Sequence, residues 1–418
     1  MDTEYAVLVG LDWADQKHDL CWRETDTGQI HTGVIEQRPE RINAWIVALI
    51  AEHPGRRIAV CLEQSRGAVV YALMSYAEVD LYPVNPVTLA EYRKAFRPSG
   101  AKDDPTDAAL ALDLLERHHD TLKIWRPDTE LTRLLRSLCE DRRKAVDART
   151  ALCNSMRARL KEHYPQALQL VGEELYSELC CALLMKWPRF EAIAAAKPDT
   201  VRRFYYGQHS RSEALIQQRL DLIASSRPLT TDGAVVEAGM RWIKTLVAQI
   251  RAFNHAIADY DQRIAEVFKS HPDASIFASF PGAGKKLAPR LIAVFGTDRD
   301  RYETAVNVAT YSGVAPVIER SGKQEWIRWR WHCPQFLRQS LVEFAGHSVG
   351  FSAWARIYYD EQIKRGKGHQ AAVRALAFKW LRILFRCWKE RMPYDEAKYL
   401  AALQRHGSWI ATALKHAA

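Results

Sequence analysis

The sequence has no uncharged apolar run of about 18 residues, the length that a membrane-spanning helix needs. Its first residues, MDTE, are acidic and lack the basic and apolar segments of a secretion signal. The eight cysteines are scattered, and no two have the Cys-x-x-Cys spacing of a zinc or redox site. These absences exclude a membrane partner and predict a cytoplasmic protein with reduced thiols.

Basic residues are concentrated in one part of the chain. The 418 residues carry a formal net charge of +9. Residues 318–391 alone hold 15 Lys and Arg against 6 Asp and Glu, so the remainder of the chain is neutral. A local basic excess indicates a polyanionic partner, and nucleic acid is the commonest one. A generally basic soluble protein is the alternative.

Residues 1–127 have the pattern of an α/β domain. Apolar runs predict strands at 6–11, 18–23, 30–35, 58–63, 79–84 and 122–125. Helical spacing predicts helices at 41–51, 68–77 and 105–117, the last with Pro105 in its first turn. Three successive strands followed by alternating helices and strands favour a ribonuclease-H-like fold over a Rossmann fold.

The rest of the chain is predicted to be mainly helical, in three parts. Within residues 128–272, apolar residues at 129–165 and 236–267 recur at helical or heptad spacing. They predict a coiled coil or a long antiparallel helix pair, in one chain or between subunits; an ordinary bundle helix is the alternative. Residues 273–395 form a mainly α domain that opens with a turn similar to a helix-hairpin-helix, and residues 396–418 form a helical tail.

Four carboxylates end or begin predicted elements. Asp12 and Glu63 end two apolar strands, whereas Asp104 and Asp107 lie three residues apart at the start of a helix, on one face. Carboxylate oxygens bind hard cations, and a pair of such ions assists phosphoryl transfer. We therefore predict that these four acids bind Mg²⁺ or Mn²⁺. The alternatives are a turn at Asp12 and ordinary helix stabilisation by the other pair.

Four other charged residues lie close in sequence to these acids. Asp103 competes with Asp104 as a ligand, although the spacing to Asp107 favours Asp104. Lys102 is placed to neutralise charge or contact phosphate. Asp15 and Asp19 are predicted to be solvated.

A second catalytic candidate lies about two hundred residues later. Ser321 precedes a glycine and is flanked by Arg320 and Lys323. A serine with basic neighbours becomes a nucleophile once its proton is removed, so we predict that Ser321 attacks phosphorus. Ser312, also before a glycine, is a rival, and a plain turn is the alternative.

The segment after Ser321 predicts a nucleic-acid-binding surface. Residues 326–331 (WIRWRW) alternate as a strand, and arginines beside aromatics suit a phosphate backbone with stacking; a core strand with a basic edge is the alternative. Basic helices and a basic loop follow. The predicted contacts are Lys102, Arg320, Lys323, Arg328, Arg330, Arg338, Lys364, Arg365, Lys367 and Arg374.

These motifs together resemble those of the DEDD transposases of bacterial insertion sequences. The matching stretches, in family order, are residues 9–14 (VGLDWA), 58–63 (IAVCLE), 102–108 (KDDPTDA), 280–284 (FPGAG), 311–316 (YSGVAP) and 321–322 (SG). The family usually has Thr or Ser where this chain has Asp103.

The resemblance implies a fold and a mechanism. Residues 1–127 are expected to be RuvC-like, with Asp12, Glu63, Asp104 and Asp107 as the metal-binding quartet. Ser321 is expected to form a phosphoserine link with DNA. Members of the family assemble as dimers and tetramers with a composite active site, and a structured guide RNA pairs with target and donor DNA.

The sequence is compatible with three functions. The first is an RNA-guided DNA recombinase that moves an insertion element. The second is a junction-cleaving nuclease that uses water, with Ser321 merely structural. The third is a non-catalytic nucleic-acid-binding scaffold.

Overall fold

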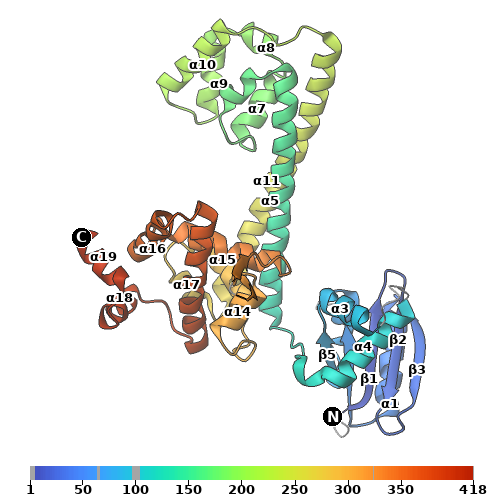
Figure 1. Ribbon diagram of the computed structural model, residues 1–418. Helices are drawn as coiled ribbons and strands as arrows, with labels where there is room; N and C mark the ends of the chain where they lie inside the picture. Colours follow the sequence, from blue (N-terminus) through green and yellow to red (C-terminus); the bar gives the residue numbers. More distant parts are fainter. Residues whose placement is uncertain (1–4, 64–65, 97–103, 323, 418) are drawn as a thin grey trace. The chain divides into compact units, whose positions relative to one another are not determined.

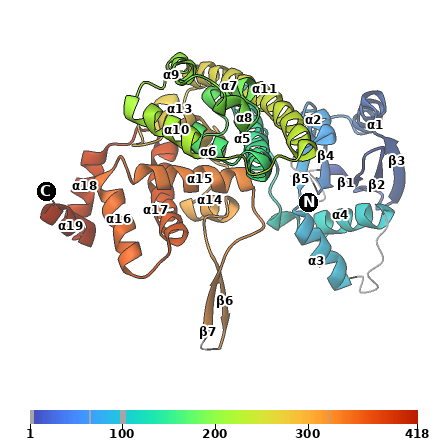
Figure 2. The same cartoon turned by 90° about the horizontal axis from the view of Figure 1, so that it is seen from above.

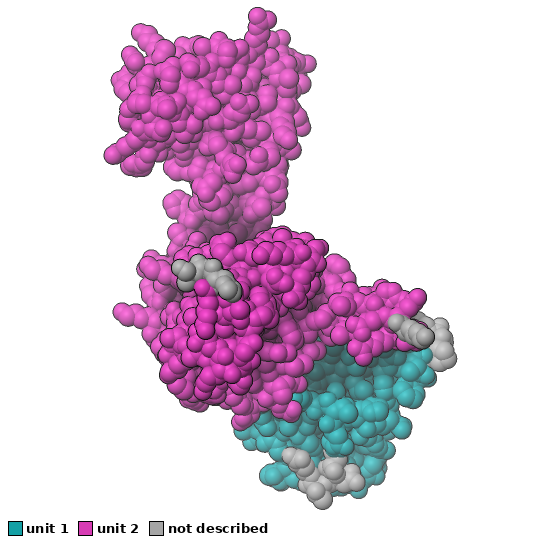
Figure 3. Space-filling view, turned by 60° about the vertical axis from the view of Figure 1, so that its left-hand side comes forward, with its two compact units in different colours: residues 1–127 teal, residues 128–418 magenta. Residues whose placement is uncertain are grey.

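The chain forms two compact units, residues 1–127 and 128–418 (Figure 3). The computed structural model describes residues 5–63, 66–96, 104–322 and 324–417. Within these ranges, no helix combines the length and the apolar character that crossing a bilayer requires.

Unit 1 is a five-stranded sheet with helices on both faces (Figure 1). The strands are β1 (Tyr5–Trp13), β2 (Lys17–Glu24), β3 (Ile30–Glu36), β4 (Arg57–Leu62) and β5 (Val79–Pro83), in the order β3-β2-β1-β4-β5. The first three are antiparallel neighbours, whereas β4 runs parallel to both β1 and β5. A meander followed by parallel crossovers agrees with the ribonuclease-H-like expectation.

The helices of unit 1 are α1 (Pro39–Glu52), α2 (Ala68–Leu73), α3 (Pro86–Phe96) and α4 (Asp104–His118), followed by a short 3₁₀ turn, η1 (His119–Thr121). Side chains alternate along each strand, so each face of the sheet has its own core. Val9, Leu11 and Leu62 pack with α1 and α2. Leu8 and Cys61 pack on the opposite face with α3 and α4.

Helix α4 lies directly on β1 because Gly10 leaves room for it. A Cβ atom at Gly10 would overlap the backbone carbonyl oxygen of Ala108 and the backbone nitrogen of Leu112. The missing side chain therefore lets the helix backbone touch the strand backbone. This contact holds the N-terminal half of α4 against the centre of the sheet.

One predicted strand of this unit is wrong. Residues 122–125 do not form a strand; Trp125 makes a single antiparallel bridge to Leu81. The amide of Trp125 donates to the carbonyl of Leu81 at 2.7 Å. The segment that leaves η1 thus has one backbone bridge to the edge strand β5, and the next residue, Arg126, pairs with Asp80 of that strand at 3.1 Å.

Unit 2 is helical apart from one hairpin. Its helices are α5 (Glu130–His163), α6 (Gln166–Val171), α7 (Glu178–Lys186), α8 (Phe190–Ala194), α9 (Pro198–Gly207), α10 (Glu213–Ser225), α11 (Gly233–Ser270), α12 (Ala274–Ala278), α13 (Gly284–Phe295), α14 (Ala305–Tyr311), α15 (Gln335–Ser348), α16 (Ala353–Lys364), α17 (His369–Glu390), α18 (Glu396–Arg405) and α19 (Trp409–Ala417). The hairpin strands are β6 (Val317–Ser321) and β7 (Gln324–Arg328).

The two long helices pair with each other inside this chain. Arg142 of α5 binds Asp261 of α11 at 2.6 Å, and Arg149 binds Asn254 at 2.8 Å. From Arg142 to Arg149 the residue numbers in α5 increase, whereas those of the α11 partners decrease from 261 to 254. The two helices are therefore antiparallel. One core, with α6–α10, forms around the end of the pair that contains Leu160, and a second, with α12–α17, forms around the opposite end.

The contact at Gly10 gives a first prediction. Replacing Gly10 with Ala should separate α4 from β1, since overpacking of a close contact costs about 1–3 kcal/mol. We expect faster amide hydrogen exchange in β1 and α4 of the full-length protein. Gly233→Ala is the control, because a Cβ at the start of α11 meets no atom within 4 Å. Unchanged protection in α4 of the Gly10 variant would show that the contact is dispensable.

Candidate active site

Three acids lie on the sheet face that α4 covers. In the parallel register Leu11 pairs with Leu62, so Asp12 and Glu63, the next residues, are neighbours at the carboxyl ends of β1 and β4. Leu11 and Leu62 point to the α1–α2 core. Because side chains alternate, Asp12 and Glu63 belong to the opposite face, beside α4.

The third acid is Asp19, which the sequence analysis predicted to be solvated; this prediction is wrong. Asp19 is buried, with 4% of its surface exposed, and it pairs directly with Asp12 across the antiparallel β1–β2 ladder. Directly opposed residues project to the same face, so the two carboxylates are neighbours. Lys17 Nζ lies 3.6 Å from one Asp19 oxygen and offsets part of the charge.

Asp107 approaches the same region from α4. It is next to Ala108, whose carbonyl oxygen touches Gly10, and it is buried with 2% of its surface exposed. Its carboxylate lies 2.5 Å from a guanidinium nitrogen of Arg93 on α3. Arg93 therefore supplies the positive charge that a buried carboxylate requires.

Asp104 is the first residue of α4. The predicted residues Lys102 and Asp103 lie outside the described residues. Among the side chains that are described, no three His, Cys, Asp or Glu groups are close enough to hold one metal ion. The fold thus places Asp12, Asp19 and Glu63 on the sheet face that is covered by α4, the helix of Asp107. The described side chains of these acids are not close enough to form a metal-binding site.

Cys61 lies on the face of these acids and has a protonated thiol. Burial, followed by the negative charge of Glu63, raises the pKa of Cys61 to about 12. Without a bound metal the Cys61 thiol therefore stays protonated at neutral pH, whereas a metal ligand has to be the thiolate. The donors available here are carboxylate oxygens, which suit hard cations.

The buried ion pair between Arg93 and Asp107 gives a second prediction. Arg93→Gln leaves a buried carboxylate without its partner and should lower the free energy of unfolding by about 3–5 kcal/mol. The double variant Arg93→Gln/Asp107→Asn should recover part of that loss, because no buried charge is left. Urea unfolding monitored by circular dichroism measures both.

Arg117→Gln is the matched control, because Arg117 pairs with Asp113 on the exposed side of α4. It should change stability far less than Arg93→Gln. If the losses in the free energy of unfolding caused by the single substitutions at Arg93 and Asp107 simply add up in the double variant, the two residues do not interact directly.

Ser321 lies at the turn end of the β6–β7 hairpin, which extends away from the helices of unit 2 (Figure 2). It pairs with Gln324, and Gly322 has a φ of 58°, which suits a tight hairpin turn. Ser321 is exposed, whereas its rival Ser312 is fully buried at the end of α14. Access to a large substrate therefore favours Ser321. Its neighbour Lys323 lies outside the described residues.

The hairpin is shorter than the sequence indicated. The strand predicted for residues 326–331 ends at Arg328, so Trp329 and Arg330 lie beyond it. On the hairpin, Arg320 pairs with Glu325 at 2.8 Å and Arg328 pairs with Glu319 at 2.7 Å. These exposed ion pairs are weak, so phosphate could replace the glutamates at little cost.

The predicted basic loop joins α16 to α17. Arg365 pairs with Glu361 at 2.8 Å, and Lys367 donates to the side-chain oxygen of Gln362 at 2.7 Å. Lys364 is the last residue of α16 and is exposed. Arg338 and Arg374, from α15 and α17, instead converge on Trp329, a grouping that strand alternation had not indicated.

Comparisons with known proteins identify the family of the chain. Residues 9–165 match a transposase family of the DEDD type found in IS110, and residues 274–360 match the family described as Transposase IS116/IS110/IS902. The two matches together cover more than half of the chain. They define the class of the protein as a transposase, an enzyme that cleaves DNA.

Within that class, the chain belongs to the IS110 family. It is 28% identical to a mini-circle putative transposase for IS117 from Streptomyces coelicolor, over 95% of this chain and 97% of that one. It is 27% identical to an uncharacterized 42 kDa protein of insertion element IS900 from Mycobacterium paratuberculosis, over 95% and 99%. A pilin gene-inverting protein of Moraxella lacunata is 27% identical over 35% of this chain and 48% of its own.

Proposed function

We propose that this transposase cleaves and rejoins DNA by attack of Ser321 on a phosphodiester, assisted by Mg²⁺ or Mn²⁺ held in unit 1. The observation that carries the proposal is the placement of Asp12, Asp19 and Glu63 on the sheet face beneath α4, close to Asp107. In a transposase, such a set of hard oxygen donors suits metal-assisted phosphoryl transfer. We take unit 1 as the RuvC-like domain, residues 128–272 as the helical region, 273–395 as the serine-bearing domain and 396–418 as the tail.

Asp12, Glu63, Asp104 and Asp107 are the proposed ligands. When bound, the ions supply positive charge to the reacting phosphate. Arg93 contacts Oδ1 of Asp107, which leaves the other carboxylate oxygen as the proposed metal ligand. Asp19, opposite Asp12, holds a further negative charge next to the ligands and so favours the cation.

Ser321 performs the covalent step. Its hydroxyl loses a proton as its oxygen forms a bond to phosphorus, and the bond from phosphorus to one ester oxygen breaks. The leaving oxygen takes up a proton. The phosphoserine link retains the phosphodiester bond energy, so the same serine can be displaced when strands are rejoined.

The serine and the acids belong to different units, so the active site requires the units to meet. We propose that unit 1 of one subunit meets the hairpin of another in a homodimer or homotetramer, as the family resemblance implies. The exposed position of Ser321 on a projecting hairpin supports delivery to a separate site. Guidance by a structured RNA rests on the same resemblance and on the basic excess of residues 318–391.

Ser321→Ala should abolish strand exchange, by at least about a thousandfold, because the attacking oxygen is removed. Binding of DNA and RNA should persist. The assay is strand exchange between two labelled DNAs, with a denaturing gel that detects a covalent protein–DNA adduct.

Ser312→Ala is the control and should retain both the exchange and the adduct. If the Ser321 variant still exchanges strands, or if the Ser312 variant loses the adduct, the nucleophile is misassigned. Normal cleavage without any adduct would indicate a nuclease that uses water.

Metal binding can be measured apart from catalysis. Asp12→Asn should weaken Mn²⁺ binding by at least about tenfold, and Asp19→Asn by about tenfold, since even neighbours of a ligand usually matter that much. Titration of Mn²⁺ followed by electron paramagnetic resonance gives both affinities. Asp15→Asn is the control, because Asp15 is exposed. Equal affinities for all four proteins would disprove the metal site.

A further inference from the structure

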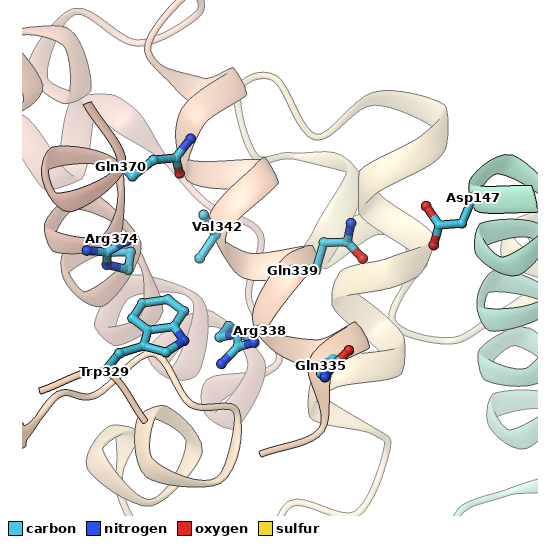
Figure 4. Close-up of a pocket in the computed structure, with 8 residues that line it drawn as sticks. All are labelled: Asp147, Trp329, Gln335, Arg338, Gln339, Val342, Gln370 and Arg374. Carbon is cyan, nitrogen blue, oxygen red and sulfur yellow. The ribbon is translucent and has the colours of Figure 1, made fainter. Parts of the chain in front are cut away.

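A cavity of about 400 Å³ opens in unit 2 between the segment that follows the hairpin and the helices α5, α15 and α17 (Figure 4). Its polar lining consists mainly of two arginines and three glutamines, grouped beside one tryptophan. These residues are Trp329, Gln335, Arg338, Gln339, Gln370 and Arg374. The volume is in the range of a site for one small ligand and far below what a duplex needs.

The tryptophan organises two positive charges. The guanidinium carbons of Arg338 and Arg374 lie 4.6 and 4.4 Å from the ring centroid of Trp329. Both are within cation–π range of the same indole. Arg338 also donates to the carbonyl of Arg330 at 2.9 Å, which ties the segment after β7 to α15. The two guanidiniums are therefore held near each other by packing.

No carboxylate compensates this pair within the described part of the chain. Asp147 also lines the cavity, but Arg143 already binds it, at 2.7 Å. Burial, followed by the positive charge of Arg338, lowers the pKa of Arg374. Two adjacent cations without a protein anion form a site that an external anion would stabilise.

The N-terminal ends of two helices also favour an anion in the cavity. Gln335 is the first residue of α15 and Gln370 is the second residue of α17, so both helices direct their N-terminal ends to the cavity. Helix N-termini attract phosphate. The amides of Gln335, Gln339 and Gln370 each offer a donor and an acceptor, which is what the polar edge of a nucleobase requires.

We propose that this cavity holds one unpaired nucleotide of a nucleic-acid strand. The guanidiniums of Arg338 and Arg374 bind its phosphate, and the glutamine amides bind the edge of its base. A paired base cannot enter, because its duplex is wider than the cavity. The selective ligand is thus a single strand, of DNA or of RNA.

The position of the cavity connects this site to the proposed function, on which it rests. Trp329 directly follows β7, and Ser321 lies opposite the first residue of that strand. Five residues of strand separate them, or about 17 Å. The nucleotide site therefore holds a strand a few nucleotides away from the phosphate that Ser321 attacks.

The test uses the full-length Ser321→Ala protein, so that binding is measured without strand exchange. The probes are fluorescein-labelled 20-mers of thymidine and of uridine, and a 20-base-pair DNA duplex. The double substitution Arg338→Gln/Arg374→Gln, and Trp329→Leu separately, should weaken single-strand binding about ten- to a hundredfold. Duplex binding should change less than about twofold. A larger loss with the thymidine or the uridine strand identifies DNA or RNA as the source of the nucleotide.

Two matched controls lie away from the cavity. Arg386→Gln removes a charge from α17, where Arg386 pairs with Glu390, and Trp242→Leu removes an exposed indole from α11. Both should leave single-strand affinity within about twofold of the parent protein. Circular dichroism confirms that each variant is folded.

A bromouracil cross-link locates the nucleotide directly. Irradiation of a strand that carries 5-bromouracil should attach the base to the peptide containing Trp329, and the Arg338/Arg374 variant should lose this adduct. An equal loss of duplex and single-strand affinity, or a cross-link elsewhere only, overturns the nucleotide site. If the parent protein binds none of the probes, the proposed function fails as well; if it binds them all but is insensitive to these substitutions, only the nucleotide site fails.

Discussion

The contact between the backbone of α4 and the backbone of β1 at Gly10 is the constraint on which the candidate site depends. Any larger residue at Gly10 would collide with Ala108 and Leu112. Since Asp107 precedes Ala108, the same contact sets how far the α4 acids lie from the carboxyl end of β1. The absence of a single side chain thus determines whether acids distant in the sequence can act on one ion.

Charge balance explains why these acids tolerate burial. Asp107 is neutralised by Arg93, and Asp19 in part by Lys17. A divalent cation would provide the same compensation more strongly. Arg93 thus stabilises the buried Asp107 carboxylate when no cation is bound.

Much of the fold could be predicted from the sequence, because periodicity is a local property. Short apolar runs located β1 to β5, and helical spacing located α4, α5 and α11. Which residues of two strands face each other depends on how the strands pair, and a local pattern does not contain that information. The sequence around Asp19 therefore did not indicate that it faces Asp12. The available signal was the position of Asp19 inside the strand predicted for residues 18–23, where a side chain projects onto one face of the sheet.

The nucleotide site was missed for a related reason. Strand alternation over residues 326–331 placed Trp329 on the face opposite Arg328 and Arg330. However, β7 ends at Arg328, so the alternation does not continue to Trp329. Arg338 and Arg374 reach Trp329 from two other helices, which only the tertiary fold brings together. Likewise, helical and heptad spacing indicated that α5 and α11 pair, but not whether they do so within one chain; the ion pair between Arg142 and Asp261 lies within this chain.

The most direct test of the central claim locates the metal on the chain. Fe²⁺ bound in place of Mg²⁺ produces hydroxyl radicals with peroxide and ascorbate, and these radicals cut the nearest backbone. The account predicts cuts in three segments that are distant in the sequence, around Asp12, Glu63 and Asp107, and their suppression by excess Mg²⁺. Cuts confined to one segment, or unaffected by Mg²⁺, would contradict a shared metal site.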